Sequence, residues 1–346
     1  MHRDDTWPER AAAELRPALA AAVSHGNVPG AVAVLGRPGT ALVVLTHGTL
    51  GAECGPHAPD RHTRYDLASL TKVLATWPLV GQARHAARLD LDAPIRTIDA
   101  ELPPPGADLT VRQLMAHTSG LLPETNLAQY HHSGRPLAHH LCAEPLVSTP
   151  GTEHRYVDRG FILLGLLLPT VLGAPLDRLA DDLWRDLGLT ATAYGPLPRS
   201  PQLAPTEQRL LGAPRTWGIP HDPSAALLGG VAGHAGVFST AADLAAFAER
   251  LLDPPDPLAA WLAAWLAESA RPQAAAGPGL HRGLAWLGTG DGRALYHHGY
   301  TGTSLYLSPA TGRYLVLLTN AVYHGWDRAR LTPVRDLALR LVARSP

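Results

Sequence analysis

A serine and a lysine three residues apart are the strongest chemical signal in this chain. Ser69 and Lys72 lie in the run 65–76, whose residues favour a helix. Positions i and i+3 share one face of a helix, so the serine hydroxyl and the lysine amine can meet. A serine hydroxyl is a weak nucleophile unless a neighbouring base takes its proton, and the start of a helix offers backbone N–H groups to an oxyanion. The pair therefore predicts covalent catalysis through an acyl-serine.

The amino-acid composition strengthens the case for the lysine. The chain has 346 residues, and of its 29 lysine and arginine side chains only Lys72 is a lysine, the other 28 being arginines. Arginine keeps its proton in proteins, whereas lysine can release one and act as a base. A lone lysine close to a serine is therefore a candidate for acid–base work. We expect Pro78, which lies beyond one further turn, to end or kink the helix.

Composition and charge also exclude several classes of protein. The chain is 46% hydrophobic and 17% charged, with a net charge of −1, which argues against disorder and against a basic nucleic-acid surface. Cys54 and Cys142 are too few for a disulfide framework and lack zinc-site spacing, so we expect two buried thiols. The charged, amphipathic N-terminal segment and the lack of a long apolar run predict a cytoplasmic protein without a membrane span.

Further motifs occur in an order that is typical of one superfamily. Residues 69–72 read Ser-Leu-Thr-Lys, residues 156–158 read Tyr-Val-Asp, and residues 297–302 read His-His-Gly-Tyr-Thr-Gly. These motifs, with supporting segments at 114–121 and 229–240, resemble those of the serine β-lactamase and penicillin-binding-protein superfamily. The resemblance is to its class C-like branch of esterases, D-aminopeptidases and β-lactamase-like enzymes, and it covers nearly the whole chain.

The resemblance implies a role for each matching position. Ser69 would be the acylated nucleophile, and Lys72 would shape its proton transfer. Tyr156 would share the role of base, with its pKa lowered by the nearby lysine cation. The backbone N–H groups of Ser69 and Tyr300 would form the oxyanion hole, and His297 would face the nucleophile from its strand. No cofactor is implied.

Two positions depart from the classical motifs. His297 stands where classical members have a lysine, and a mostly neutral histidine weakens the cationic anchor for the carboxylate of a β-lactam. Asp158 stands where they have an asparagine, and it lacks the amide donor and adds negative charge near Lys72. Both changes favour esters over penicillins. We expect Asp158, Gly299 and Tyr300 to contact substrate, with Asp158 either pairing with the lysine or attracting a cationic substrate group.

Other polar and aromatic side chains carry weaker predictions. His117 is expected to be a structural turn residue. Five side chains are open between lining the pocket and ordinary packing or loop structure: Tyr130, Trp217, His221, Asp222 and His234. The adjacent histidines at 131–132, 139–140 and 297–298 point in different directions, so no metal site is predicted.

The elements that must position these residues follow from hydrophobic periodicity. Helices are expected over 7–24, 111–116, 161–168, 176–187 and 331–344. Strands are expected over 31–35, 41–46, 283–287, 304–307 and 314–319. Together with the resemblance, which implies a β-lactamase-like fold, these elements predict one α/β (α+β) domain over 1–346. An antiparallel sheet formed by both termini and flanked by helices would make one lobe, about 1–66 and 230–346, with a mostly helical lobe, about 67–229, inserted.

The function that these features favour is hydrolysis of a small-molecule carboxylic ester through an acyl-enzyme on Ser69. The alternatives are amide hydrolysis, as in a D-aminopeptidase or a weak β-lactamase, and acyl transfer in a biosynthetic pathway. A catalytically silent ligand-binding homologue is disfavoured because Ser69, Lys72 and Tyr156 are all present. The expected partner is a small-molecule ester or amide, with no nucleic acid and no membrane. The sequence leaves the oligomeric state open.

Overall fold

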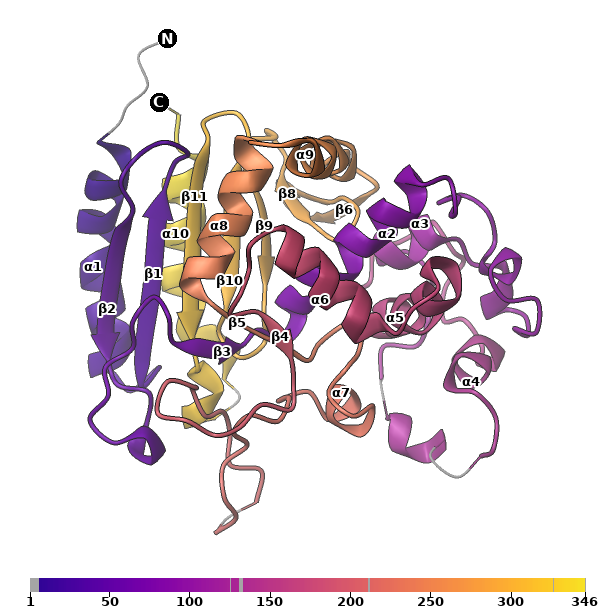
Figure 1. Cartoon of the computed structure of the whole chain (residues 1–346), viewed down its shortest axis with the longest axis horizontal. Helices are drawn as coiled ribbons and strands as arrows, with labels where there is room; N and C mark the ends of the chain where they lie inside the picture. Colours follow the sequence, from indigo (N-terminus) through magenta and orange to yellow (C-terminus); the bar gives the residue numbers. More distant parts are fainter. Residues whose placement is uncertain (1–5, 125, 131–132, 211, 326, 346) are drawn as a thin grey trace.

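An antiparallel sheet of eight strands forms one half of the molecule (Figure 1). The computed structural model describes residues 6–124, 126–130, 133–210, 212–325 and 327–345. The strands lie in the order β2 (Val43–Gly48), β1 (Gly30–Gly36), β11 (Arg313–Thr319), β10 (Ser304–Ser308), β9 (Leu295–His298), β8 (Leu287–Thr289), β7 (Leu280–Arg282) and β6 (Ala274–Gly277). Strands from the two ends of the chain therefore pair with each other, β1 beside β11, next to the edge strand β2.

Helices cover both faces of this sheet because its central strands are apolar on both sides. Alternate residues of a strand point to opposite faces. Ala33 of β1 lies in the core shared with α1 (Trp7–Ser24) and α10 (Thr332–Ala343). Val34, the next residue, lies in the core shared with α8 (Ala241–Leu252). Figure 1 shows α8 in front of the sheet and α10 behind it.

The other half of the molecule is mostly helical. Its helices are α2 (Trp77–His85), α3 (Val111–Met115), α4 (Leu137–Ala143), α5 (Arg159–Leu172), α6 (Leu176–Asp186) and α7 (Pro223–Leu227). A small antiparallel sheet, in the order β3 (Arg64–Asp66), β5 (Val237–Thr240) and β4 (Ala193–Tyr194), contacts α8 on one side and α6 on the other. The architecture confirms the expected fold class, and the exact lobe boundaries stay a prediction.

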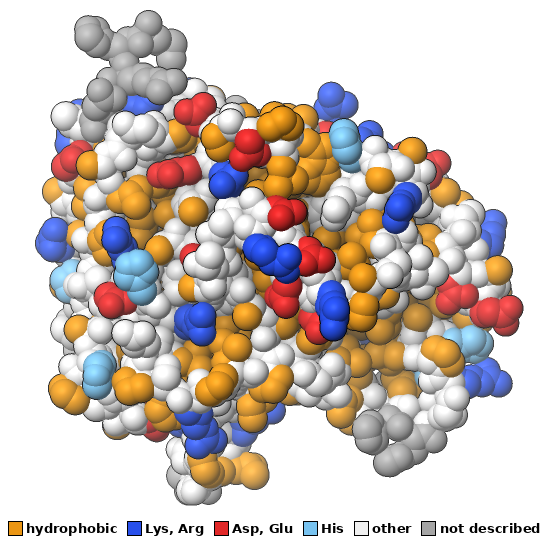
Figure 2. All heavy atoms as spheres, viewed as in Figure 1, with side chains coloured by type: hydrophobic (Ala, Val, Ile, Leu, Met, Phe, Trp, Pro, Cys, Tyr) orange, Lys and Arg blue, Asp and Glu red, His pale blue; other side chains and the backbone are white. Residues whose placement is uncertain are grey.

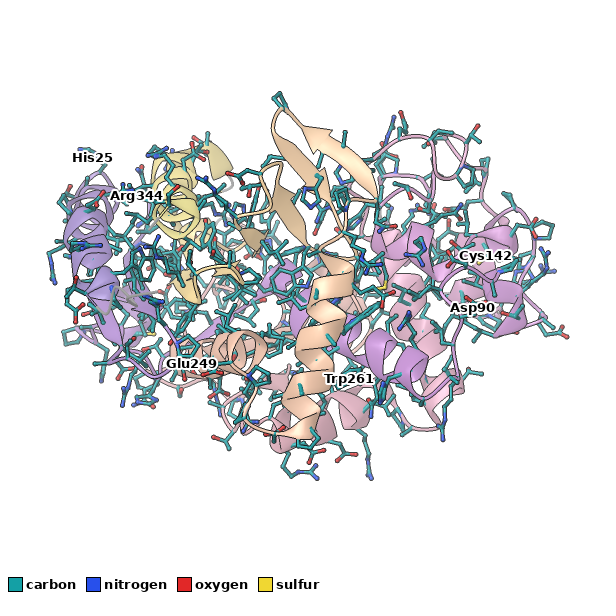
Figure 3. The ribbon with its side chains drawn as sticks, turned by 90° about the horizontal axis from the view of Figure 1, so that it is seen from above. His25, Asp90, Cys142, Glu249, Trp261 and Arg344 are labelled. Atoms are coloured by element: carbon teal, nitrogen blue, oxygen red, sulfur yellow. The ribbon has the colours of Figure 1, made fainter. Side chains whose placement is uncertain are left out.

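Tryptophans connect the helical half to the sheet. Viewed from above, α9 (Pro257–Ser269), which carries Trp261, lies between the two parts (Figure 3). Trp265 of this helix stacks on Trp77 with ring centroids 6.1 Å apart and donates a hydrogen bond of 2.9 Å to its carbonyl oxygen. Trp286, beside β8, meets Trp77 edge to face at 5.6 Å. One hydrophobic core therefore runs across both halves, which supports a stable cleft between them.

The thiols and the surface agree with the composition. Cys54 and Cys142 are both buried and unpaired, as predicted. On the face seen in Figure 2, basic and acidic side chains are interspersed.

Among the described residues, no single helix combines the length and apolar character needed to cross a membrane. Of the described helices, α5 and α6 reach that length and apolar character when they are taken together, but they meet at a bend of 79°.

The structure corrects the prediction that Pro78 ends or kinks the helix after Ser69. A π-helical segment, Lys72–Thr76, runs directly into α2, and Pro78 lies in the first turn of α2. A proline cannot donate to the carbonyl four residues earlier. The Leu74 carbonyl instead accepts a hydrogen bond of 2.8 Å from Trp184 Nε1. The wider turn and this tertiary donor together allow the helix to continue.

The strand predicted over 283–287 is also wrong. The structure has a turn there, in which Ala285 adopts a φ of +70°, and the strands are β7 before it and β8 mostly after it. The apolar run indicated burial correctly, because Leu284 and Trp286 are fully buried. It did not indicate that the chain reverses direction. The predicted hairpin of β1 and β2 and the strands β10 and β11 are confirmed, with boundaries shifted by a few residues.

Candidate active site

The Lys72 ammonium lies at the centre of the candidate site. Its Nζ is 2.8 Å from Ser69 Oγ, 2.8 Å from Asp158 Oδ1 and 3.2 Å from the His234 carbonyl oxygen. An ammonium has three protons, and these three acceptors use all of them. The lysine side chain is fully buried, whereas that of Asp158 is one-third exposed. The structure therefore brings together the serine and lysine that their spacing predicted.

Asp158 keeps the buried lysine charged. Burial alone lowers the pKa of an ammonium, but the Asp158 carboxylate and the Tyr156 side chain outweigh it and raise the pKa of Lys72 above its ordinary value. Asp158 lies directly before α5, where its backbone carbonyl accepts from Ile162. Of the two expectations for Asp158, pairing with the lysine is what the structure shows.

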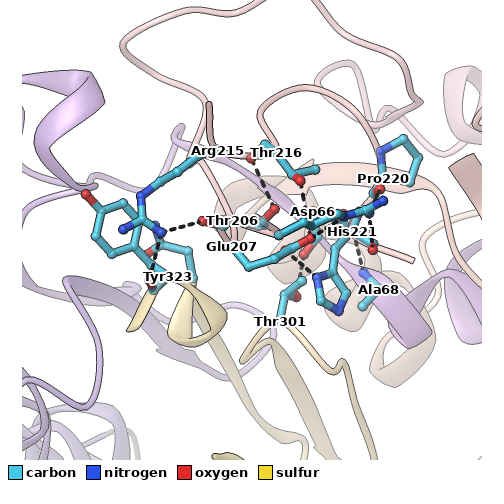
Figure 4. A network of polar contacts seen from close by, with 12 residues as sticks. Asp66, Ala68, Thr206, Glu207, Arg215, Thr216, Pro220, His221, Thr301 and Tyr323 are labelled. Carbon is cyan, nitrogen blue, oxygen red and sulfur yellow. Dashed lines mark hydrogen bonds and ion pairs between the residues drawn. The ribbon is translucent and has the colours of Figure 1, made fainter. Parts of the chain in front are cut away.

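The backbone that presents Ser69 is held by Asp66. Ala68, just before the serine, adopts a left-handed φ of +46°, which is unfavourable for a residue with a Cβ. Asp66 Oδ1 accepts the Ala68 N–H at 2.8 Å, and its Oδ2 accepts the His221 N–H at 2.5 Å. Burial raises the pKa of the Asp66 carboxyl to about 6. This carboxyl therefore links the nucleophile turn to the segment around His221 (Figure 4).

A second buried carboxylate orients His221. His221 Nδ1 lies 2.5 Å from Glu207 Oε2, and Figure 4 shows both side chains in one network with Asp66. Burial raises the pKa of Glu207, but hydrogen bonds from His221 and Arg209 outweigh it and lower that pKa to about 2. The histidine ring stacks on Tyr300, with centroids 5.2 Å apart. Glu207 and Asp66 thus fix the wall formed by His221 and Tyr300.

Tyr156 is the exposed member of a group of rings. Its side chain is 40% exposed, and the Lys72 Nζ lies 5.0 Å from its ring centroid. The ring stacks on His117 at 4.3 Å. His117 is buried, has a φ of +55°, and places Nδ1 3.0 Å from the Val157 carbonyl oxygen, within hydrogen-bonding distance. His117, which the sequence predicted to be a structural turn residue, therefore packs against the ring of Tyr156, the candidate base.

Strand β9 and the turn after it form the opposite wall. His297 is buried, and burial together with nearby cations holds its pKa well below the ordinary value. Its ring centroid lies 6.3 Å from that of Tyr156. A Cβ on Gly299 would lie 2.2 Å from the Leu67 carbonyl oxygen, so only glycine allows this turn so close to the serine. Thr303 Oγ1 also donates to Leu67 O at 2.9 Å, which ties the two segments together.

These walls enclose a cavity of about 490 Å³. Its lining residues are Ala68, Ser69, Tyr156, Asp158, His221, Asp222, Ala235, Arg282, Leu287, His297, His298 and Tyr300. His221 and Asp222, left open by the sequence, therefore line the cavity. His234 instead lies behind it, where its Nε2 bonds to Asp222 Oδ1 at 2.8 Å. The sequence did not single out Arg282, Glu207 or Asp66.

Two other candidates lie outside this cavity. Trp217 donates from its indole to the Leu203 carbonyl at 2.7 Å, and Tyr130 bonds to Glu144. Within the described part of the chain, no three histidine, cysteine or acidic side chains gather as metal ligands. The histidines at 131–132 lie outside the described residues.

Comparison with known proteins decides the family. A profile described as Beta-lactamase matches residues 15–340. The chain belongs to the beta-lactamase family. This beta-lactamase-family chain is 31% identical over 227 residues to an Escherichia coli K12 protein that is provisionally named a D-alanyl-D-alanine carboxypeptidase. That match covers 55% of the chain and 51% of the relative, so the chain spans about half the length of the curated relatives it matches.

Solved structures share the fold over almost the whole beta-lactamase-family chain. A class C beta-lactamase matches with a TM-score of 0.79 at 16% identity, covering 100% of this chain and 99% of its own. EstCE1, described as a hydrolase with promiscuous acyltransferase activity, matches with a TM-score of 0.75 at 20% identity. The match covers 97% of this chain and 99% of EstCE1. The structure of SurE with D-Leu matches with a TM-score of 0.70 at 26% identity. The match covers 96% of this chain and 76% of the SurE chain. Family and fold confirm the resemblance and indicate a hydrolase of the serine β-lactamase and penicillin-binding-protein type.

Proposed function

We propose that this protein hydrolyses carboxylic esters of small molecules through an acyl-enzyme on Ser69. One observation supports this most strongly: the Lys72 ammonium lies 2.8 Å from both Ser69 Oγ and Asp158 Oδ1, beside a cavity that Ser69 itself lines. A buried ammonium beside the serine favours negative charge on groups that face it. The substrate is a small-molecule ester that fits this cavity.

The proton of Ser69 needs an acceptor other than Lys72. The lysine is held as an ammonium by Asp158, and an ammonium nitrogen has no lone pair with which to accept a proton. We assign the acceptor role to the Tyr156 oxygen, which would take the proton in its phenolate form, because Tyr156 lines the cavity with Ser69 and its ring centroid lies 5.0 Å from Lys72 Nζ. Ser69 Oγ then bonds to the ester carbonyl carbon while its proton passes to Tyr156. Tyr156 returns this proton to the leaving alkoxide as the ester bond breaks.

The negative charge that develops on the carbonyl oxygen also needs donors. We assign the backbone N–H groups of Ser69 and Tyr300, because the segments that carry them are fastened to each other. Thr301 Oγ1 donates to Asp66 O at 2.7 Å, and Thr303 secures Leu67 in the same way. Water completes the cycle: its oxygen attacks the acyl carbon, its proton passes to Tyr156, and Ser69 is released with a proton restored.

Esters rank above amides because the site lacks two features of classical amide-cleaving members. The third motif holds a buried histidine with a low pKa in place of a lysine, and Asp158 is engaged with Lys72. Amide hydrolysis is the second candidate, since one relative is named a carboxypeptidase and SurE was solved with D-Leu. Acyl transfer would use the same intermediate with an alcohol or amine in place of water.

Turnover of p-nitrophenyl acetate and butyrate tests the proposal. We expect Ser69→Ala and Lys72→Arg each to reduce kcat/KM by about 10³-fold or more, since nucleophile and lysine act as a unit. Lys72→Arg keeps the positive charge, but the larger planar guanidinium cannot reproduce the contacts of the compact ammonium with Ser69, Asp158 and the His234 carbonyl. Mass spectrometry after fluorophosphonate treatment should show one adduct, on Ser69. Equal rates in all three proteins, with no adduct, would support a ligand-binding homologue instead.

A further inference from the structure

A buried arginine on the last helix lies behind the turn that carries Tyr300, one of the two proposed oxyanion donors. Arg335 belongs to α10 and is only 8% exposed. It is not among the described residues that line the cavity of Ser69, and the reaction proposed above gives it no task. Removing a guanidinium from water is costly unless its N–H groups find acceptors. The acceptors of Arg335 therefore indicate what it does.

Three acceptors of Arg335 belong to the turn after β9 and to the start of β10. Nη2 donates to the Gly299 carbonyl oxygen at 2.8 Å and to the Thr303 carbonyl oxygen at 3.1 Å, and Nε donates to Ser304 Oγ at 3.1 Å. The Gly299 oxygen also accepts from Gly302 N at 3.2 Å, so both of its lone pairs are used. Hydrogen bonds from a charged donor are the strong ones. The shortest of the three places a positive charge directly on the Gly299 carbonyl.

The Gly299 carbonyl and the Tyr300 N–H are the two ends of one peptide unit. This peptide bond is trans and planar, so its C=O and its N–H point in opposite directions. A cation at the oxygen draws electron density from the nitrogen side and makes the N–H a stronger donor. It also fixes the plane of the peptide, because rotation of the plane would break the bond to Arg335. The arginine therefore acts on the oxyanion donor from the far end of the donor's own peptide.

The same turn is fastened to the segment that carries the nucleophile. Gly299 N donates to Thr303 O at 2.8 Å, and Thr303 Oγ1 donates at 2.9 Å to the carbonyl of Leu67, two residues before Ser69. The peptide after Gly299 is therefore held between the nucleophile segment on one side and Arg335 on the other.

We propose that Arg335 is a positioning residue for the oxyanion hole: it polarises and orients the peptide whose Tyr300 N–H stabilises the negative charge on the substrate carbonyl oxygen. This inference rests on the proposed function, because that N–H acts on the acyl group that Ser69 carries. The negative charge develops in the transition states of acylation and of deacylation, so Arg335 stabilises these more than it stabilises the bound ester. A cation on α10 thus raises the rate without touching the substrate.

Hydrolysis of p-nitrophenyl butyrate tests the kinetic consequence. We expect Arg335→Gln, which keeps a donor but removes the charge, to lower kcat by about tenfold with KM close to the wild-type value, since acylation and deacylation slow together. Arg335→Lys restores a cation and should recover part of the loss. Arg313→Gln is the matched control, because Arg313 is also buried and donates to a backbone carbonyl, that of Arg344, outside the active site. It should keep the wild-type kcat.

Infrared difference spectra of the acyl-enzyme separate polarisation from folding. The probe is p-nitrophenyl cinnamate with ¹²C or ¹³C at the carbonyl, and the isotope difference isolates the acyl carbonyl stretch. Stronger hydrogen bonds to the carbonyl oxygen lower this frequency. We therefore expect the band to move to higher frequency in Arg335→Gln, to lie in between in Arg335→Lys, and to stay in place in Arg313→Gln. Acylated, folded protein alone gives the band, so a reduced folding yield does not move it.

A wild-type kcat or an unmoved band in Arg335→Gln would overturn the inference, and so would an effect confined to KM or an equal loss in Arg313→Gln. If Arg335→Gln does not fold, Arg335→Lys decides by the same measurements, and a wild-type kcat and band in that variant would overturn the inference. Where deacylation is too fast for the band to appear, kcat decides alone. No turnover and no acylation of Ser69 in the wild-type protein would mean instead that the proposed function itself fails.

Discussion

Two buried cations in one active-site cleft have opposite surroundings. Lys72 gives each of its three protons to an acceptor, one of which is the Asp158 carboxylate. Within the part of the chain that the structure describes, Arg282 donates hydrogen bonds only to a neutral histidine and a backbone carbonyl. Their pKa values shift in opposite directions, that of Lys72 upward because of its carboxylate and that of Arg282 downward because of burial.

The difference teaches how to distinguish catalytic from recognition groups in this fold. A cation whose partners all belong to the protein is complete before substrate arrives, so it can organise proton transfer around a fixed charge. A cation with free donors is completed only by a ligand, and its burial makes that ligand interaction strong. The contacts of Lys72 are complete within the protein, whereas Arg282 keeps N–H donors that no described residue accepts.

The largest expected contrast is in stability. Lys72→Met leaves Asp158 without its cation, and we expect the free energy of unfolding to fall by about 1–2 kcal/mol, since Asp158 is partly solvated. Arg282→Met removes an unpaired buried charge, so stability should stay the same or rise. Urea unfolding of both variants measures this. If the arginine variant proves the less stable of the two, Arg282 is structural.

A second prediction concerns the counter-charge of Lys72. Asp158→Asn removes the carboxylate that raises the pKa of Lys72, so that pKa should fall. We expect kcat/KM for p-nitrophenyl butyrate to drop by about tenfold at neutral pH. The alkaline limb of the pH profile should move to lower pH, because the lysine loses its charge earlier. An unchanged alkaline limb would mean that the ion pair does not set the protonation state that matters.

The smallest expected effect is on His154. Burial first, and the Arg282 charge second, lower its pKa to about 4. In Arg282→Gln the pKa should rise by less than about one unit, because the burial contribution remains. NMR titration of the histidine ring protons measures it, with Arg293→Gln as the control. No change in Arg282→Gln would show that the guanidinium charge is already compensated.

The same shift predicts a pH dependence of stability. Between about pH 4 and 6.5 the unfolded chain protonates His154 and the folded protein does not, so stability rises with pH and is lost on acidification. Arg282→Gln should make this loss smaller. The pKa of Asp66 is raised to about 6, so its contribution to stability falls as the pH rises. Because Asp66 is present in both the wild-type protein and Arg282→Gln, its contribution cancels when the two are compared.

Sequence reasoning reached part of the site and missed the rest for physical reasons. Ser69 and Lys72 are close in sequence, so local helical geometry was enough to predict their contact. Asp66 lies three residues before Ser69, and a carboxylate ahead of a tight turn was a usable signal. Glu207 sits in a loop with no periodic pattern. Arg282 is one of 28 arginines, and nothing in its local sequence marks it as buried.

The sequence by itself determined the nucleophile turn, the order of the motifs and the antiparallel sheet formed by both ends of the chain. The serine–lysine contact and the individual strands follow from local spacing and hydrophobic alternation, which act over a few residues, whereas the order of the motifs and the antiparallel pairing of the two ends were predicted from the family resemblance. Only the tertiary structure decided which charges meet. Asp158 reaches Lys72 across 86 positions, whereas no carboxylate of a described residue pairs with Arg282. Charge pairing depends on distances of a few ångströms in a desolvated cleft, and those distances exist only after the core has packed.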